Sequence, residues 1–132
     1  GAIYVLDASL TLISCSILRS IAQTSGTCPT SSCTIYYGRG GGIYAKGSST
    51  TIVLSFCAVS NNTVISGRAF GAGIYIERAD VNIIASTLSG NAAVAPAGYA
   101  LGGAIETSKA ETFLEIMSSI FSQNSVDGDL VG

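Results

Sequence analysis

Apolar and polar residues alternate along short stretches of this chain. Ile3 and Val5 flank a residue expected to face outward, and Leu10 and Leu12 do the same a few positions later. A spacing of two is the period of a β-strand, and no segment places apolar residues at helical spacing over the roughly ten residues that a helix needs. Gly, Ser, Asn and Asp fill the turns between these stretches. The pattern predicts an all-β chain with three short strands in each structural unit.

This unit occurs four times. The motif Gly-Ala-Ile-Tyr at 1–4 returns in related form at 41–44, 72–75 and 103–106. The isoleucines of the four motifs are 40, 31 and 31 residues apart. Extra residues in the loop around 28–33 account for the longer first interval. The underlying period is about 31 residues, which lies in the range of solenoid repeats.

The four units align in columns of like residues. Four of the apolar or small columns are Leu10, Ile52, Val81 and Leu114; Leu12, Leu54, Ile83 and Ile116; Cys15, Cys57, Ser86 and Ser119; and Ile17, Val59, Leu88 and Phe121. Strands that recur at this spacing cannot bury their inward faces alone, but they can stack on the equivalent strands of the next coil about 4.8 Å away. We therefore predict a right-handed parallel β-helix with three faces. A β-sandwich also has short strands, but it does not require the same residue types in the same columns of every repeat.

The β-helix is expected to occupy residues 1–132 as one segment. Its coils are predicted at about residues 1–40, 41–71, 72–102 and 103–132. The sequence is in phase with its own repeat, and neither end shows an amphipathic helix or a charged cap that would block open strand edges. We therefore expect the segment to belong to a longer solenoid, or to a filament in which copies stack head to tail.

A second motif follows the first in each unit and completes a resemblance to a known family. Gly-Gly-Ala-Ile at 102–105 is followed by Phe-Ser-Gln-Asn at 121–124. This pairing resembles the GGA[I/L/V] and FxxN repeats of chlamydial polymorphic outer membrane proteins and related pectin-lyase-like surface proteins. Val59 and Leu88 stand where the motif has Phe, and Ser20 replaces Asn in the first unit. The resemblance implies a β-helix in an extracellular or cell-surface protein.

Composition and charge narrow the classes of partner. Apolar residues make up 48% of the chain and charged residues 11%, against about 25% in an average domain. So few charges cannot coat a large free surface. The net charge is -2 with no basic cluster, so nucleic acid is not an expected partner. The longest weakly polar stretch, residues 92–105, is too short and too rich in Gly and Pro for a membrane span.

The four cysteines favour an oxidising, extracellular setting, because they are even in number and lack the paired CxxC spacing of a zinc site. Cys28 and Cys33 lie in one loop and are predicted to form a disulfide. Cys15 and Cys57 occupy one inward column of neighbouring coils, within disulfide range. A disulfide and a pair of buried free thiols both remain open for them.

Asn62, Asn91 and Asn124 share one column. An Asn side chain there can bond to the backbone of its own turn and to the Asn of the next coil, so we predict a structural asparagine ladder. A row of side chains that binds sugar is the functional alternative. Asn61 belongs to the sequon Asn-Asn-Thr and is expected to face outward, which makes it a candidate glycosylation site.

Tyr4, Tyr44 and Tyr75 form an outward column that ends at Glu106. Such a column could bind carbohydrate or a neighbouring protein by stacking and through its hydroxyls. The alternative is cross-strand packing that only stiffens the sheet.

One corner of each coil carries a large apolar residue. The four turns are Ile13-Ser14, Ser55-Phe56, Ile84-Ala85 and Met117-Ser118. The sequence leaves open whether these residues widen the core or form an exposed ridge.

Catalysis is not expected. The chain has no His, and its eight acidic residues are spread over turns and different faces, without the close carboxylate pair of a glycoside hydrolase. No cofactor or metal is predicted. We therefore expect a structural or adhesive module whose partners are further coils or copies of itself, and possible ligands are carbohydrate or another surface protein. The rival hypothesis is a carbohydrate-binding or polysaccharide-degrading pectin-lyase-like β-helix.

Overall fold

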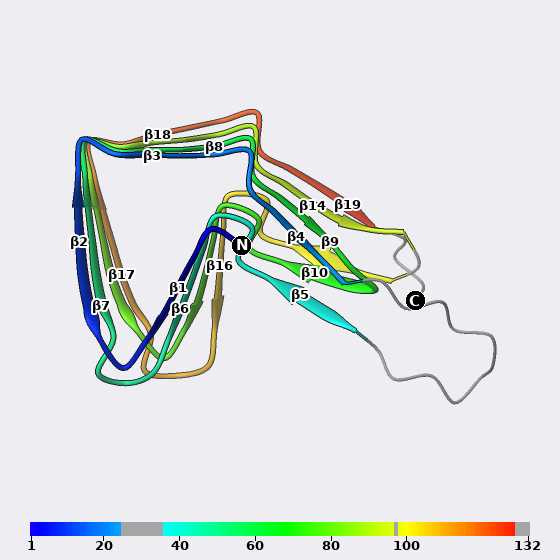
Figure 1. The fold of residues 1–132 in the computed structure, drawn as a ribbon, viewed down its shortest axis with the longest axis horizontal. Helices are drawn as coiled ribbons and strands as arrows, with labels where there is room; N and C mark the ends of the chain where they lie inside the picture. The colour runs from blue at the N-terminus through cyan, green and yellow to red at the C-terminus, as the bar shows by residue number, and fades with distance from the viewer. Residues whose placement is uncertain (25–35, 97, 129–132) are drawn as a thin grey trace.

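The computed structural model describes residues 1–24, 36–96 and 98–128, and these residues form a parallel β-helix (Figure 1). Every strand pairing among them is parallel, and none of them is helical. The first coil lies nearest the viewer in Figure 1, and the chain winds clockwise as it recedes, so the solenoid is right-handed. The predicted fold class is confirmed.

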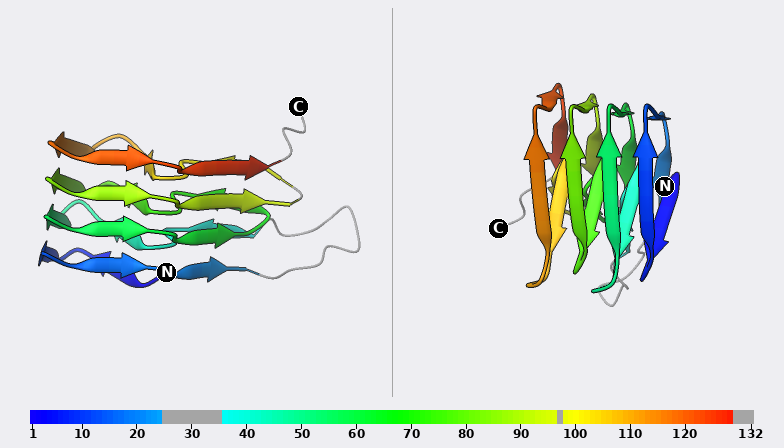
Figure 2. Two further views of the ribbon diagram at one scale, coloured as in Figure 1. Left: turned by 90° about the horizontal axis from the view of Figure 1, so that it is seen from above. Right: turned by 90° about the vertical axis from the view of Figure 1, so that its left-hand side faces the viewer.

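The strands stack into five sheets, which we call A to E (Figure 2). Sheet A contains β1 (Ile3–Leu6), β6 (Ile43–Lys46), β11 (Ile74–Glu77) and β16 (Ile105–Ser108). Sheet B contains β2 (Ser9–Ile13), β7 (Thr51–Ser55), β12 (Asp80–Ile84) and β17 (Phe113–Met117). Sheet C contains β3 (Ser16–Leu18), β8 (Ala58–Ser60), β13 (Thr87–Ser89) and β18 (Ile120–Ser122).

The last two sheets form a narrow extension of the coil (Figure 1). Sheet D contains β4 (Ile21–Gln23), β9 (Thr63–Ile65), β14 (Ala92–Ala95) and β19 (Ser125–Gly128). Sheet E contains β5 (Tyr37–Arg39), β10 (Arg68–Phe70) and β15 (Ala100–Leu101).

Coils therefore hold up to five strands, which is more than the three predicted. Sheets A, B and C are the three expected faces. Each strand of sheet E has one inward residue, and from β5 to β15 these residues are Gly38, Ala69 and Ala100. A single small inward residue produces no apolar pair at a spacing of two, so sequence periodicity did not detect these strands.

The predicted columns are the observed registers. Ile43 lies opposite Ile3 on one side and Ile74 on the other, and Ile74 lies opposite Ile105. Like residues therefore meet across every pair of coils, as an in-register parallel stack requires.

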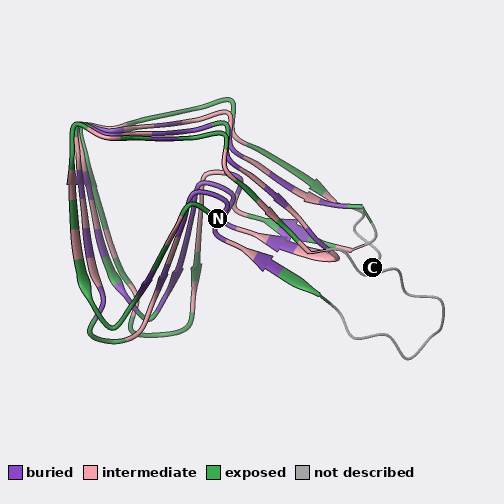
Figure 3. Ribbon diagram, viewed as in Figure 1, coloured by how far each residue is buried: buried purple, intermediate pink, exposed green. Residues whose placement is uncertain are grey.

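The core has two parts. The larger part lies between sheets A, B and C and consists mainly of Ile, Leu and Val, which are fully buried in the two middle coils, where Figure 3 shows buried residues in purple. The smaller part lies between sheets D and E, and its members are Val64, Ala69, Ala72, Ala93, Ala95 and Ala100. Alanine and glycine let the two sheets approach closely, since a Cβ added to Gly38 would lie 2.6 Å from Cγ1 of Val64.

Residues with positive φ turn the corners between sheets A and B, B and C, C and D, and E and A, whereas Ser66 and Gly67, between sheets D and E, do not have positive φ. Between sheets B and C these residues are Ser14, Phe56, Ala85 and Ser118. Between sheets E and A they are Gly40, Gly71 and Gly102. Glycine is required at this last corner, because an added Cβ would come within 2.4 Å of the carbonyl oxygen three residues later in all three coils.

The apolar residues at the corner between sheets B and C face solvent. Ile13 is 64% exposed and Phe56 is 67% exposed, Met117 is also exposed, and Ile84 is half-buried. Phe56 adopts the left-handed conformation with φ of 54°, which directs its side chain away from the coil. These residues form an exposed ridge and do not widen the core.

Candidate functional site: the corner between sheets A and E

The asparagine column joins the coils from inside. The Nδ2 group of Asn62 donates to Oδ1 of Asn91 at 3.0 Å, and Nδ2 of Asn91 donates to Oδ1 of Asn124 at 2.9 Å. Each amide also binds backbone: Nδ2 of Asn91 donates to the carbonyl of Val59, while its Oδ1 accepts the N–H of Asn62. Asn62 and Asn91 are fully buried. Their amides therefore form hydrogen bonds within the stack of turns and are not accessible to a ligand.

A second polar ladder lies in the column of Cys15, Cys57, Ser86 and Ser119. Oγ of Ser86 accepts the N–H of Cys57 at 3.0 Å and donates to the carbonyl of Ile84 at 2.8 Å. Oγ of Ser119 accepts the N–H of Ser86 at 3.1 Å. The column pattern had indicated packing only. Its recurrence at a corner, where backbone N–H groups need acceptors, was the signal for a polar role.

Cys15 and Cys57 are free thiols, each near backbone carbonyls of its corner. Cys57 is buried, with Sγ 3.3 Å from the carbonyl oxygen of Leu12. The predicted disulfide between Cys28 and Cys33 lies outside the described residues. Asn61, the sequon residue, is exposed at the corner between sheets C and D with φ of 56°.

Exposure of the tyrosine column changes from one coil to the next. Tyr4 is 57% exposed, Tyr44 is half-buried and Tyr75 is only 4% exposed. The rings pack on one another, with centroids 5.0 Å apart for Tyr4 and Tyr44 and 5.2 Å apart for Tyr44 and Tyr75. These side chains point out of sheet A as expected, but a neighbouring sheet covers most of the column.

Sheet E provides this cover. Figure 1 shows sheets A and E meeting at an inward angle, so that their outer faces turn toward each other. The ring of Phe70 on β10 lies 6.1 Å from that of Tyr75, and the guanidinium carbon of Arg39 on β5 lies 5.4 Å from the same ring centroid. Tyr75 is therefore enclosed although it faces away from the main core.

Aromatic rings and guanidinium groups alternate on the outer face of sheet E. Arg68 lies opposite Tyr37 in the register, and its guanidinium carbon is 5.5 Å from the ring centroid of Tyr37 and 4.7 Å from that of Tyr99. Nη1 of Arg68 also donates to the hydroxyl of Tyr37 at 2.9 Å. Arg39 lies opposite Phe70 and stacks on Tyr37 at 5.3 Å. The contacts of Arg39 and Arg68 with these tyrosine rings are cation–π pairs.

We call this set of residues the corner cluster. Its members are Tyr4, Tyr37, Arg39, Tyr44, Arg68, Phe70, Tyr75 and Tyr99. The column pattern of the sequence indicated only the three tyrosines of sheet A, because the other five members lie on or beside sheet E, which that pattern did not predict.

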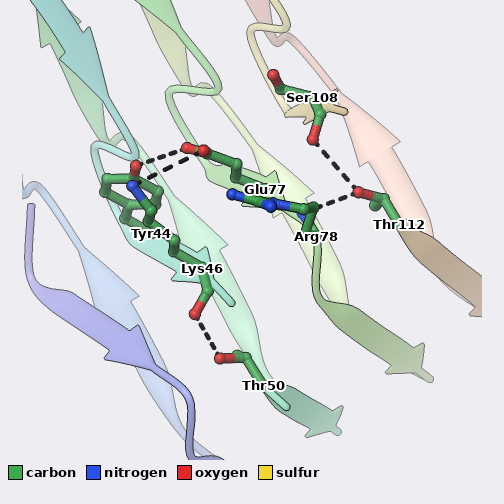
Figure 4. Close-up of polar contacts among 7 residues, drawn as sticks. All are labelled: Tyr44, Lys46, Thr50, Glu77, Arg78, Ser108 and Thr112. Carbon is green, nitrogen blue, oxygen red and sulfur yellow. Dashed lines mark hydrogen bonds and ion pairs between the residues drawn. The ribbon is translucent and has the colours of Figure 1, made fainter. Parts of the chain in front are cut away.

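Polar contacts connect Tyr44 of the corner cluster to neighbouring residues of sheet A (Figure 4). The hydroxyl of Tyr44 donates to Oε2 of Glu77 at 2.9 Å, and Nζ of Lys46 lies 3.7 Å from Oε1 of the same carboxylate. Burial and the hydrogen bond to Glu77 raise the pKa of Tyr44 to about 12, so this phenol remains a donor at neutral pH. Figure 4 also shows the turn that leads to sheet B, where Oγ1 of Thr112 accepts the N–H of Arg78 at 3.1 Å.

A recess adjoins the corner cluster beside the first coil. It has a volume of about 390 Å³ and is lined by Tyr37, Arg39 and Tyr44 together with residues of β4. Among residues 1–24, 36–96 and 98–128, no group of three His, Cys, Asp or Glu side chains could hold a metal ion. The same residues include no helix long and apolar enough to cross a membrane.

Comparisons with known proteins add no relative. A scan against protein-family models, a search of curated proteins and a search of solved structures found no match. The resemblance to polymorphic outer membrane proteins therefore rests on the sequence motifs alone.

Proposed function

We propose that this chain is a structural and adhesive module of an extracellular or cell-surface protein, and that it is not an enzyme. The observation that supports this proposal best is the unbroken, in-register stack, in which the same columns run through all four coils. Each coil is tied to the next by backbone pairing and by the asparagine ladder, so the stack is a stiff spacer that presents side chains on its outer faces.

The low charge fits such a role. A spacer that packs against further coils or copies needs little charge on the surfaces it covers. The buried carboxylate of Glu77 is engaged by Tyr44 and Lys46, which is a structural use of an acid. A carbohydrate-binding role is the second candidate, and the corner cluster favours it.

End-to-end stacking is part of this proposal. Ile116, Phe121 and Val126 belong to inward columns but remain exposed on the open face of the fourth coil. Burial of these apolar side chains is favourable because it removes apolar surface from water. A further coil or the first coil of a second copy would bury them.

Sedimentation of residues 1–132 tests the stacking. We expect the mass to grow with protein concentration, and we expect Ile116→Lys to stop this growth because a charge on the open face opposes burial. Ile120→Lys is the matched control, since Ile120 is exposed on the outer side of sheet C and should leave the growth unchanged. A folded wild-type protein that remains monomeric at high concentration would contradict end-to-end stacking.

A further inference from the structure

The corner cluster gathers more than half of the aromatic residues of the chain. It contains five of the six tyrosines and one of the four phenylalanines. Tyr4, Tyr37 and Tyr99 retain substantial exposure, whereas Tyr75 is enclosed beneath them. The rings therefore do more than fill space between sheets, because three of them still present a face or an edge to solvent.

Its two guanidinium groups form no ion pair with a carboxylate of the described residues. Among the described residues the ion pair is Lys46 with Glu77, so neither Arg39 nor Arg68 has a carboxylate within ion-pair distance there. Nε of Arg39 is buried and has no hydrogen-bond partner among the described atoms. A guanidinium has five N–H donors in one plane, so a single bond such as that from Nη1 of Arg68 to the hydroxyl of Tyr37 leaves further donors for another acceptor.

The ligand that fits must bind through these side chains. The backbone groups of β6, β10 and β11 are paired with the coils on both sides, so a ligand binds these strands through side chains, and among the strands that carry the cluster a peptide could add a strand only at the edge strands β1 and β5. A pyranose offers an apolar face to an aromatic ring and hydroxyls to phenols, and an acidic pyranose also offers an anion to a guanidinium.

We propose that the corner cluster binds an acidic glycan, with the in-plane N–H groups of Arg39 and Arg68 pairing with its carboxylate or sulfate groups. The exposed rings of Tyr37 and Tyr99 then form the platform for the sugar. This inference rests on the adhesive part of the proposed function and names its ligand class.

Titration with defined glycans tests the inference. The probes are hyaluronan oligosaccharides, which carry carboxylates, dextran sulfate, which carries sulfates, neutral dextran, and a poly-glutamate peptide. The chain has no Trp and five of its six tyrosines belong to the corner cluster, so tyrosine emission reports binding mainly from this cluster. We expect binding of one or both acidic glycans that weakens as salt rises, and the probe that binds identifies the anionic group.

Paired substitutions locate the site. We expect Arg39→Gln and Arg68→Gln each to weaken binding by about tenfold or more, because each removes a charge-assisted hydrogen bond. Arg19→Gln is the matched control: Arg19 is exposed at another corner with φ of 54°, and Gln123 occupies the equivalent corner with the same φ. This control should keep wild-type affinity.

Several results would overturn the inference. These are no binding of either acidic glycan by the folded protein, equal binding of neutral dextran or poly-glutamate, and an equal loss of binding in Arg19→Gln. Circular dichroism and the sedimentation test above report the fold and the stacking separately, so failure of the ligand is distinguishable from failure of the structural proposal.

Discussion

In this solenoid, the structural role of a residue depends on its column as much as on its residue type. Glu106 illustrates the point, because it interrupts the tyrosine column of sheet A and lies opposite Tyr75. A carboxylate takes the position where three coils place a phenol. Burial raises the pKa of Glu106 above its ordinary value.

The stability of the protein should therefore depend on the charge of Glu106. The folded state holds the Glu106 proton at pH values where the unfolded state has lost it, so stability falls as pH rises through the ordinary carboxyl pKa toward the raised one. We expect Glu106→Gln to be more stable than the wild type at pH 7 and equal to it near pH 3.5, in denaturant unfolding at a series of pH values. Glu115→Gln, on the exposed face of sheet B, is the control and should keep the wild-type pH dependence. A gain from Glu106→Gln that is the same at all pH values would contradict this explanation.

At the scale of elements, the turns decide how coils are joined. Most corners between sheets use residues with positive φ, and Ser oxygens between sheets B and C and Asn oxygens between sheets C and D accept backbone N–H groups. The asparagine ladder connects the turns after sheet C, where each amide both donates and accepts. The same Asn side chains therefore stabilise both the turns and the stacking of one coil on the next.

Asn91→Ala should be strongly destabilising for this reason. It removes the partner of the N–H and Nδ2 groups of Asn62 and of the carbonyl of Val59, all in a buried turn. We expect a loss of about 3 kcal/mol in the free energy of unfolding, measured with urea, because buried polar groups remain unpaired. Ser89→Ala breaks only a part-buried hydroxyl contact with Ser60 and should cost about 1 kcal/mol or less. Similar losses for the two variants would show that the ladder is not the main support of the turn.

The whole molecule behaves as a one-dimensional stack. Each coil contacts the coils on either side, and the pairings run in register from the first coil to the fourth. Stability in such arrays is the sum of coil terms and neighbour terms, so a coil can be removed when the register is kept.

Two deletions of nearly equal length test this property. Removal of 76–106 joins Tyr75 to Thr107 and keeps the alternation, since Thr107 lies opposite Ile76 in the same inward column. Removal of 76–105 leaves Glu106 in the inward position and shifts the strand by one residue, which reverses its faces. We expect the first variant to keep a β spectrum and cooperative unfolding with a shorter axis, and the second to lose both, by circular dichroism and small-angle scattering. Equal behaviour of the two variants would contradict the in-register stack.

The sequence by itself determined the β-helix, its columns and its registers. The reason is that parallel stacking brings residues one repeat apart into contact, so the pattern along the chain is also the pattern between coils. Ile3, Ile43, Ile74 and Ile105 align by sequence repeat alone, and the same four residues lie opposite one another in sheet A.

Only the tertiary structure decided what the outer faces present. The burial of Tyr75, the outward direction of Phe56 and the cluster of Arg39 and Arg68 with aromatic rings depend on the angles between sheets. Corner residues with positive φ set these angles, and sheet E itself rests on single small residues that leave no periodic signal. Column patterns specify which residues stack on one another, whereas the angle between two faces determines which outward residues meet.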